Sequence, residues 1–71
     1  MSKNVLAQTI GANIREFRKK RGMSQAYIAE WSDIAQCQVW NYEHGINTPS
    51  VKTLEKICGC LGVSATDILG F

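Results

Sequence analysis

The sequence predicts an all-α fold, and three observations support that prediction. Apolar residues recur every three or four positions, which is the spacing of one face of an amphipathic helix. No stretch alternates apolar and polar residues with a period of two, as a half-buried strand would. Glycines and a single proline divide the chain into short pieces. Because the chain has only 71 residues, we expect residues 1–71 to form one small domain with a modest core.

Five helices are expected, and local chemistry marks most of their ends. They cover about residues 5–21, 25–32, 36–44 and 51–61, followed by a last short helix that carries Ile68 and Leu69. Ser24 and Ser50 are favourable N-caps, and "SATD" at 64–67 resembles a capping box. Glycines favour the left-handed conformation found just past helix ends, and three helices are followed by one: Gly22, Gly45 and Gly62.

Apolar stripes on these helices identify the residues expected in the core. In the first helix, Ile10, Ile14 and Phe17 fall at i, i+4 and i+7. The second helix has only eight residues and is too short to be stable unless it packs on the others. The remaining residues expected on apolar faces are Ile28, Ala29, Ala35, Val39, Tyr42, Val51, Leu54, Ile57, Cys58, Leu61, Ile68 and Leu69.

A tight turn is expected at Asp33 and Ile34, because the helical pattern restarts immediately after them. Asp33 stands where the turn requires a left-handed conformation, which Asp tolerates better than most residues do. A short helix, a tight turn and a second helix form the helix-turn-helix arrangement.

The segment "QCQVWNYEHG", residues 36–45, places Trp40 and Tyr42 two positions apart, so both cannot face one core. At about 100° per residue, Tyr42 falls with Val39 on the apolar face. Trp40 falls on the opposite, uncharged polar face, which also carries Gln36, Cys37, Asn41 and His44. Gln and Asn can pair bidentately with adenine in the major groove, so this face suits a recognition helix. The alternative is a surface helix that happens to be low in charge.

Glu43 lies at the edge of the apolar face, where a carboxylate needs a partner to stay charged. Arg18 is the best candidate, since it follows Ile14 and Phe17 on the first helix. Alternatively, Glu43 reaches solvent.

The net charge of +2 is mild, but five of the eight basic residues lie in "REFRKKR", residues 15–21. Such a cluster is either a solvated helix end, since Lys and Arg favour a helix C-terminus, or a patch that faces phosphates. On charge alone we favour the solvated end.

Composition argues against several other classes of protein. The three cysteines, Cys37, Cys58 and Cys60, are an odd number and lack zinc spacing, so no disulfide framework, metal site or cofactor is expected. No apolar run approaches the roughly 18 residues of a membrane span, and "MSKNVLAQT" lacks a signal peptide, so we expect a cytoplasmic protein. With one histidine and no nucleophile–base constellation, we expect no enzyme.

Two longer stretches, "IREFRKKRGMSQAYIAE" and "VWNYEHGINTPSVKTLEKICGCLGVSATDIL", resemble the helix-turn-helix domain of the Cro and phage-repressor (XRE-type) family. The resemblance covers about residues 10–69 without insertions. Its most specific parts are "RxxxGMSQ", the aromatic–Glu–x–Gly of "YEHG", and the "PS…L…I…LGVS…DIL" pattern. It implies a compact five-helix, lambda-repressor-like bundle whose third helix enters the major groove.

The resemblance also implies roles for individual residues. DNA bases would be contacted by Gln36, Cys37, Trp40 and Asn41, and DNA phosphates by Gln25, His44 and Thr48. Arg18 and Glu43 match a buried or half-buried salt bridge, and Gln25 matches a residue that braces the recognition helix.

The sequence departs from the family pattern around the third helix. Asp33 replaces a glycine, and Ala35 replaces a Ser or Thr cap at a cost of about 1 kcal/mol. The loop "INT", 46–48, lacks the basic residues that relatives often carry, which predicts a shallow salt dependence. Trp31 and Trp40 stand where relatives carry small or polar residues.

These observations favour a sequence-specific double-stranded DNA-binding transcriptional regulator, expected to be a repressor and a homodimer on a near-palindromic operator. The alternative is a protein-interaction module or an antitoxin that uses Trp31 and Trp40, because Trp is enriched at interface hot spots. Trp40 itself has three candidate surfaces: the wall of the DNA groove, Trp31 or a partner subunit, and a second protein.

Overall fold

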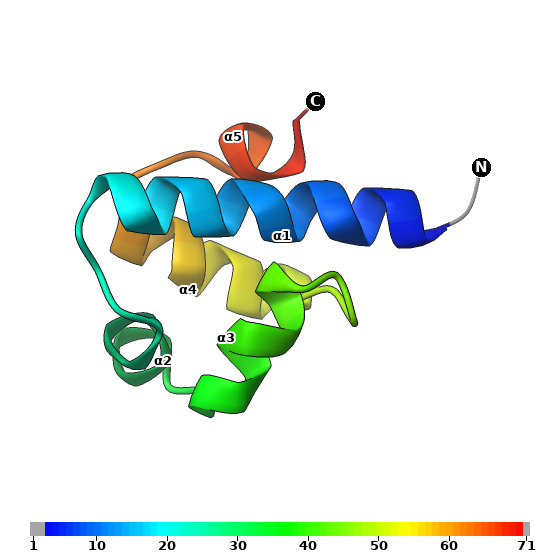
Figure 1. Ribbon diagram of the computed structural model, residues 1–71. Helices are drawn as coiled ribbons and strands as arrows, with labels where there is room; N and C mark the ends of the chain where they lie inside the picture. The colour runs from blue at the N-terminus through cyan, green and yellow to red at the C-terminus, as the bar shows by residue number, and fades with distance from the viewer. Residues whose placement is uncertain (1–2, 71) are drawn as a thin grey trace.

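Five helices make up the part of the chain that the computed structural model describes, which is residues 3–70 (Figure 1). They are α1 (Lys3–Lys20), α2 (Gln25–Ser32), α3 (Gln36–Glu43), α4 (Val51–Leu61) and α5 (Ala65–Leu69). No strand occurs within the described range, so the predicted all-α class and the five helices are confirmed. Residues 1, 2 and 71 of the predicted domain lie outside that range.

The longest helix, α1, crosses the whole molecule, and the other helices are arranged around it (Figure 1). α3 and α5 pack against α1, whereas α2 packs against α3 and α4, and α4 also contacts α5. In the view of Figure 1, α2 and α3 lie on one side of α1 and α5 lies on the other. The two helices of the predicted helix-turn-helix are therefore grouped at one side of the molecule.

Serine side chains cap three of the helices, as the sequence predicts. Ser24, Ser50 and Ser64 each accept a hydrogen bond from the backbone N–H three residues further on. In the last case Asp67 accepts a bond from the Ser64 backbone N–H at 3.0 Å, which completes the predicted capping box. Because these bonds are local, they can be inferred from the spacing of the residues alone.

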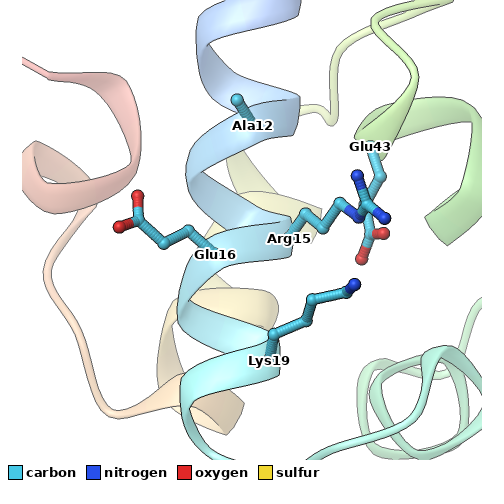
Figure 2. A pocket seen from close by; sticks show the side chains of 5 residues that line it. All are labelled: Ala12, Arg15, Glu16, Lys19 and Glu43. Carbon is cyan, nitrogen blue, oxygen red and sulfur yellow. The ribbon is translucent and has the colours of Figure 1, made fainter.

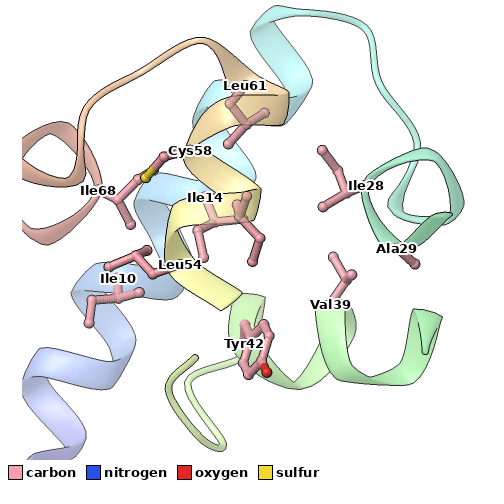
Figure 3. Close-up of a cluster of buried hydrophobic side chains, with 11 residues drawn as sticks. Ile10, Ile14, Ile28, Ala29, Val39, Tyr42, Leu54, Cys58, Leu61 and Ile68 are labelled. Atoms are coloured by element: carbon pink, nitrogen blue, oxygen red, sulfur yellow. The ribbon is translucent and has the colours of Figure 1, made fainter. Parts of the chain in front are cut away.

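The core consists of aliphatic side chains that converge from all five helices (Figure 3). Five of them have no exposed surface: Ile14, Ile28, Val39, Ile57 and Ile68. Tyr42 also lies in this cluster, and Phe17 and Leu69 are partly buried against it. The core therefore includes at least one residue of every predicted helix.

The prediction that Val51 belongs to the buried stripe of α4 is wrong, because 76% of its surface is exposed. It is the first residue of α4 and lies at the edge of the stripe formed by Leu54, Ile57 and Leu61. A residue in the first turn extends beyond the neighbouring helices, so helical spacing alone overestimates its burial.

Gly11 allows α1 to approach the backbone of α3 closely. A Cβ atom added to Gly11 would lie 2.0 Å from the carbonyl oxygen of Tyr42 and 3.0 Å from the carbonyl carbon of Glu43. No side chain can occupy that space. This role of Gly11 was not predicted, although a glycine inside a helical pattern often has a packing reason.

Candidate nucleic-acid interface

The turn between α2 and α3 has the geometry that the sequence predicts. Asp33 adopts a left-handed conformation, with φ 58° and ψ 47°, and its backbone N–H donates to the carbonyls of Ala29 and Glu30. The backbone N–H of Ile34 also donates to the Ala29 carbonyl, at 3.0 Å. Ala35 then occupies the N-cap position before α3 and provides no side-chain cap. The end of α2 therefore sets the direction in which α3 leaves the turn.

α3 presents one face to the core and another to solvent, as helical spacing predicts, except that Ala35, which was expected on the apolar face, is exposed. Tyr42 is 8% exposed, whereas Trp40 is 44% exposed. Gln36 and Cys37 are also exposed, and Asn41 is half-buried. A shallow, open depression is lined by Gln25, Gln36, Cys37 and Trp40, so the first residue of α2 lies beside the start of α3. Four of the seven residues expected to contact DNA thus meet at one place.

His44 is held against Trp40 by two contacts. Their rings stack with centroids 3.6 Å apart and an interplanar angle of 16°. His44 Nδ1 lies 2.8 Å from the carbonyl oxygen of Trp40. A carbonyl oxygen only accepts, so Nδ1 carries the proton and the neutral ring exposes an acceptor at Nε2. Nδ1 is thus engaged within α3 itself, and the contact of His44 with a phosphate stays a prediction.

The two tryptophans do not stack on each other within the described chain. Trp40 packs on His44, whereas a Cβ added to Gly59 of α4 would lie 3.3 Å from the ring of Trp31. Trp31 is 52% exposed. The groove wall, a partner subunit and a second protein remain as candidate surfaces for Trp40.

Glu43 is the centre of a hydrogen-bond network that joins α1, α2 and α3. Arg18 donates from Nε to Oε2 at 2.6 Å and from Nη2 to Oε1 at 3.0 Å, which is the ion pair expected from the sequence. Gln25 Nε2 donates to Oε1 at 3.1 Å, and Arg18 Nη1 donates to the Met23 carbonyl at 2.8 Å. The Glu43 side chain is only 1% exposed, which corrects the alternative that it reaches solvent.

The bond from Gln25 to Glu43 was not anticipated, although the resemblance implied that Gln25 braces the recognition helix. The bond links the beginning of α2 to the end of α3 and uses one of the amide N–H groups of Gln25. No sequence pattern within either helix indicates this contact, since it depends on how the two helices cross. Thr48 lies apart from this network, in the exposed loop that follows α3.

The three cysteines differ in exposure. Cys37 is exposed on α3, Cys58 is buried, and Cys60 is intermediate. Burial raises the pKa of the Cys58 thiol, and the carboxylates of Asp67 and Glu55 raise it further. Burial also raises the pKa of Cys60. Within residues 3–70, no group of three His, Cys, Asp or Glu side chains is placed to hold a metal ion, and no helix is long and apolar enough to cross a membrane.

We expect iodoacetamide to alkylate Cys37 roughly tenfold faster than Cys58 in the folded protein at pH 8. The thiolate is the reactive form, and Cys58 is buried and its thiol has a raised pKa, so less of it is both accessible and ionised. Mass spectrometry of digested samples would measure the rates. Cys37→Ser should remove the fast reaction, and bound DNA should slow it. Faster labelling of Cys58 in the native state would contradict the assignment.

A short helix, a left-handed turn and a second helix with a polar outer face together define a helix-turn-helix unit, here supported by α1 and α4. Comparison with known proteins agrees with this geometry. The chain belongs to the helix-turn-helix family, whose model matches residues 14–68.

Two curated relatives illustrate the similarity. The immunity repressor protein of Bacillus phage phi105 is 32% identical over 62 residues, which are 87% of this chain and 43% of the repressor. The HTH-type transcriptional regulator SinR of Bacillus subtilis (strain 168) is 34% identical over 61 residues, 84% of this chain and 55% of SinR. The chain therefore spans about half the length of these relatives.

Solved structures are similar over nearly the whole chain. SinR, the master regulator for biofilm formation, in complex with DNA is 34% identical with a TM-score of 0.79, covering 84% of this chain and 97% of that one. The clp gene regulator ClgR from Corynebacterium glutamicum is 31% identical with a TM-score of 0.86, covering 90% of this chain and 68% of that one.

Proposed function

We propose that this chain binds double-stranded DNA in a sequence-specific manner and acts as a transcriptional regulator. The observation that carries the proposal is the exposed, uncharged polar face of α3, which a buried ion pair and a tight turn hold in one orientation. Amide side chains on such a face match the donor and acceptor pattern of base edges in the major groove. The complex of SinR with DNA supports this reading.

In the proposed complex, α3 lies in the major groove with its beginning toward the bases. Gln36, Cys37 and Asn41 contact base edges, and Trp40 packs on the groove wall against sugar or a thymine methyl group. Residues around the two ends of the helix-turn-helix contact phosphates, namely Gln25, His44 and Thr48. Phosphate contacts fix the position of the protein, whereas contacts to bases determine which sequence it prefers.

The proposed regulator acts as a homodimer on a near-palindromic operator. One small reading helix contacts only a few base pairs, so a single copy has limited specificity. Two copies related by a twofold axis read two half-sites about one helical turn apart. The similarity to the phi105 immunity repressor protein favours repression as the outcome.

Selection from a random pool of duplexes tests the proposal, and Gln36→Ala is the informative variant. We expect it to weaken binding by about 1–3 kcal/mol at one base-pair position and to relax the preference there. Gln38→Ala is a matched control, because Gln38 is an amide on the same helix and outside the polar face defined above. An equal loss on every sequence would instead make Gln36 a backbone contact, and failure to enrich any sequence would contradict the proposed function.

The exposed Trp31 favours a second candidate, which is a protein-interaction module or antitoxin on the same fold. Trp31 lies on α2 across from α4, outside the depression at the start of α3. SinR has also been solved in a complex with the SinI protein. Retention on random duplex at low salt, followed by release at high salt, distinguishes the regulator from a module that binds protein only.

A further inference from the structure

A second depression lies between α1 and the end of α3, and two basic side chains extend into it (Figure 2). It is lined by Ala12, Arg15, Glu16, Lys19 and Glu43. Figure 2 shows Arg15 and Lys19 on the same side of α1 as Glu43, whereas Glu16 points to the opposite side. Arg15 and Lys19 are one helical turn apart and both exposed.

The acidic groups nearest to these cations already have other partners. Both oxygens of Glu43 accept hydrogen bonds from Arg18, and one also accepts from Gln25. The ion pair of Glu16 is with Lys20, at 3.4 Å. Among the described residues, neither Arg15 nor Lys19 has a carboxylate within ion-pair distance. The depression therefore holds two positive charges that the folded chain does not neutralise.

The other basic residues of the cluster 15–21 are arranged differently. Lys20 and Arg21 lie over the ring of Phe17, with the Lys20 ammonium and the centre of the Arg21 guanidinium 5.7 and 5.3 Å from its centroid. Arg18 forms an ion pair with Glu43. Of the described basic residues in this cluster, Arg15 and Lys19 are therefore the two that remain available to an external anion at the α1–α3 boundary. The cluster thus separates into one structural residue, two that cover an aromatic ring, and two free cations.

The position of the depression indicates which anion it would meet. Glu43 forms part of its wall, and Glu43 is bonded to Gln25 and followed directly by His44. Gln25 and His44 are two of the residues proposed to contact phosphates. Side chains four apart on a helix have Cβ atoms roughly 5–6 Å apart, so Arg15 and Lys19 present their charges side by side.

We propose that Arg15 and Lys19 bind backbone phosphates of the duplex immediately outside the base pairs read by α3. This inference rests on the proposed function and adds a contact that carries no base specificity. It also accounts for the loop "INT", 46–48, which lacks basic residues after α3. In this arrangement α1 supplies the electrostatic attraction to the duplex that the loop does not.

The double variant Arg15→Gln/Lys19→Gln tests the inference through the salt dependence of DNA binding. Each phosphate contact contributes about 0.9 to the slope of log Kobs against log salt concentration, so the slope should become shallower by about 1.8. The loss should be equal for every sequence, and the selected site should stay the same. Shortening the duplex to remove the flanking base pairs should reduce wild-type binding to the level of the double variant.

A matched control is Arg21→Gln/Lys56→Gln, which removes the same charge from outside the depression. Arg21 lies over the ring of Phe17, and Lys56 is exposed on α4. This variant should keep most of the wild-type slope. An equal decrease in both variants would overturn the site, because net charge alone would then explain the effect, and so would an unchanged slope in Arg15→Gln/Lys19→Gln. A wild-type protein that binds no duplex would overturn the proposed function itself, which distinguishes that failure from the first two.

Discussion

Replacing Glu43 with Gln is expected to lower the free energy of unfolding by roughly 3–5 kcal/mol, the range for breaking a buried ion pair from one side. The exposed fractions of the Arg18 and Glu43 side chains are 11% and 1%. Removing the carboxylate leaves the guanidinium buried without a counter-charge. It also weakens the bonds that hold α1, α2 and α3 together. In a domain of 71 residues, this is a large part of the total stability.

Urea unfolding followed by circular dichroism would measure the effect. Glu16→Gln is a matched control, because it removes the same charge from an exposed pair with Lys20, and we expect a change within about 1 kcal/mol. Arg18→Met combined with Glu43→Gln should recover part of the loss, since neither partner is then left charged. An unchanged unfolding midpoint in Glu43→Gln would show that the pair contributes little. The preferred DNA sequence should not change in any variant that folds.

Gly11→Ala is expected to destabilise the protein by about 3 kcal/mol or more, in contrast to the gain of about 1 kcal/mol that alanine usually brings inside a helix. The added methyl group would lie 2.0 Å from the carbonyl oxygen of Tyr42. Both obstacles, at Tyr42 and Glu43, are backbone atoms, so no rotation of a side chain can relieve the clash. α1 and α3 would have to separate, which disturbs the core around Val39 and the orientation of the reading helix.

The control for this prediction is Gly59→Ala, which places a methyl group inside another helix. There the nearest atom, at 3.3 Å, belongs to the ring of Trp31, which is half exposed and free to shift. We therefore expect a change of no more than about 1 kcal/mol in either direction. Thermal unfolding of both variants provides the comparison. Wild-type stability in Gly11→Ala would mean that α1 and α3 can move apart at little cost.

The sequence alone was sufficient to predict the helices and which face of each helix points toward the core. Ser24, Ser50 and Ser64 cap helices through bonds that span only three residues, so local spacing determines them. The left-handed conformation of Asp33 was predictable because the helical pattern restarts directly after it, which requires a tight turn there. The opposite placement of Trp40 and Tyr42 follows from helical geometry within one short segment.

Contacts between helices were only partly predictable. The pairing of Arg18 with Glu43 could be inferred because a carboxylate at the edge of an apolar face needs a counter-charge. The bond from Gln25 to Glu43 and the close approach at Gly11 could not, since both depend on how the helices cross. The exposure of Val51 was missed for a similar reason, because burial at a helix end depends on which neighbours extend over it.

Sequence patterning by itself therefore determined the all-α fold, the helix-turn-helix and the polar face of α3, because these follow from interactions within a few residues of one another. Tertiary structure decided what the charged and titratable groups can do. It engaged Arg18 with Glu43 and left Arg15 and Lys19 without an acidic partner among the described residues. The chemistry of a side chain depends on the distance to its nearest donor, acceptor or charge, and that distance is set only when helices remote in the chain pack together.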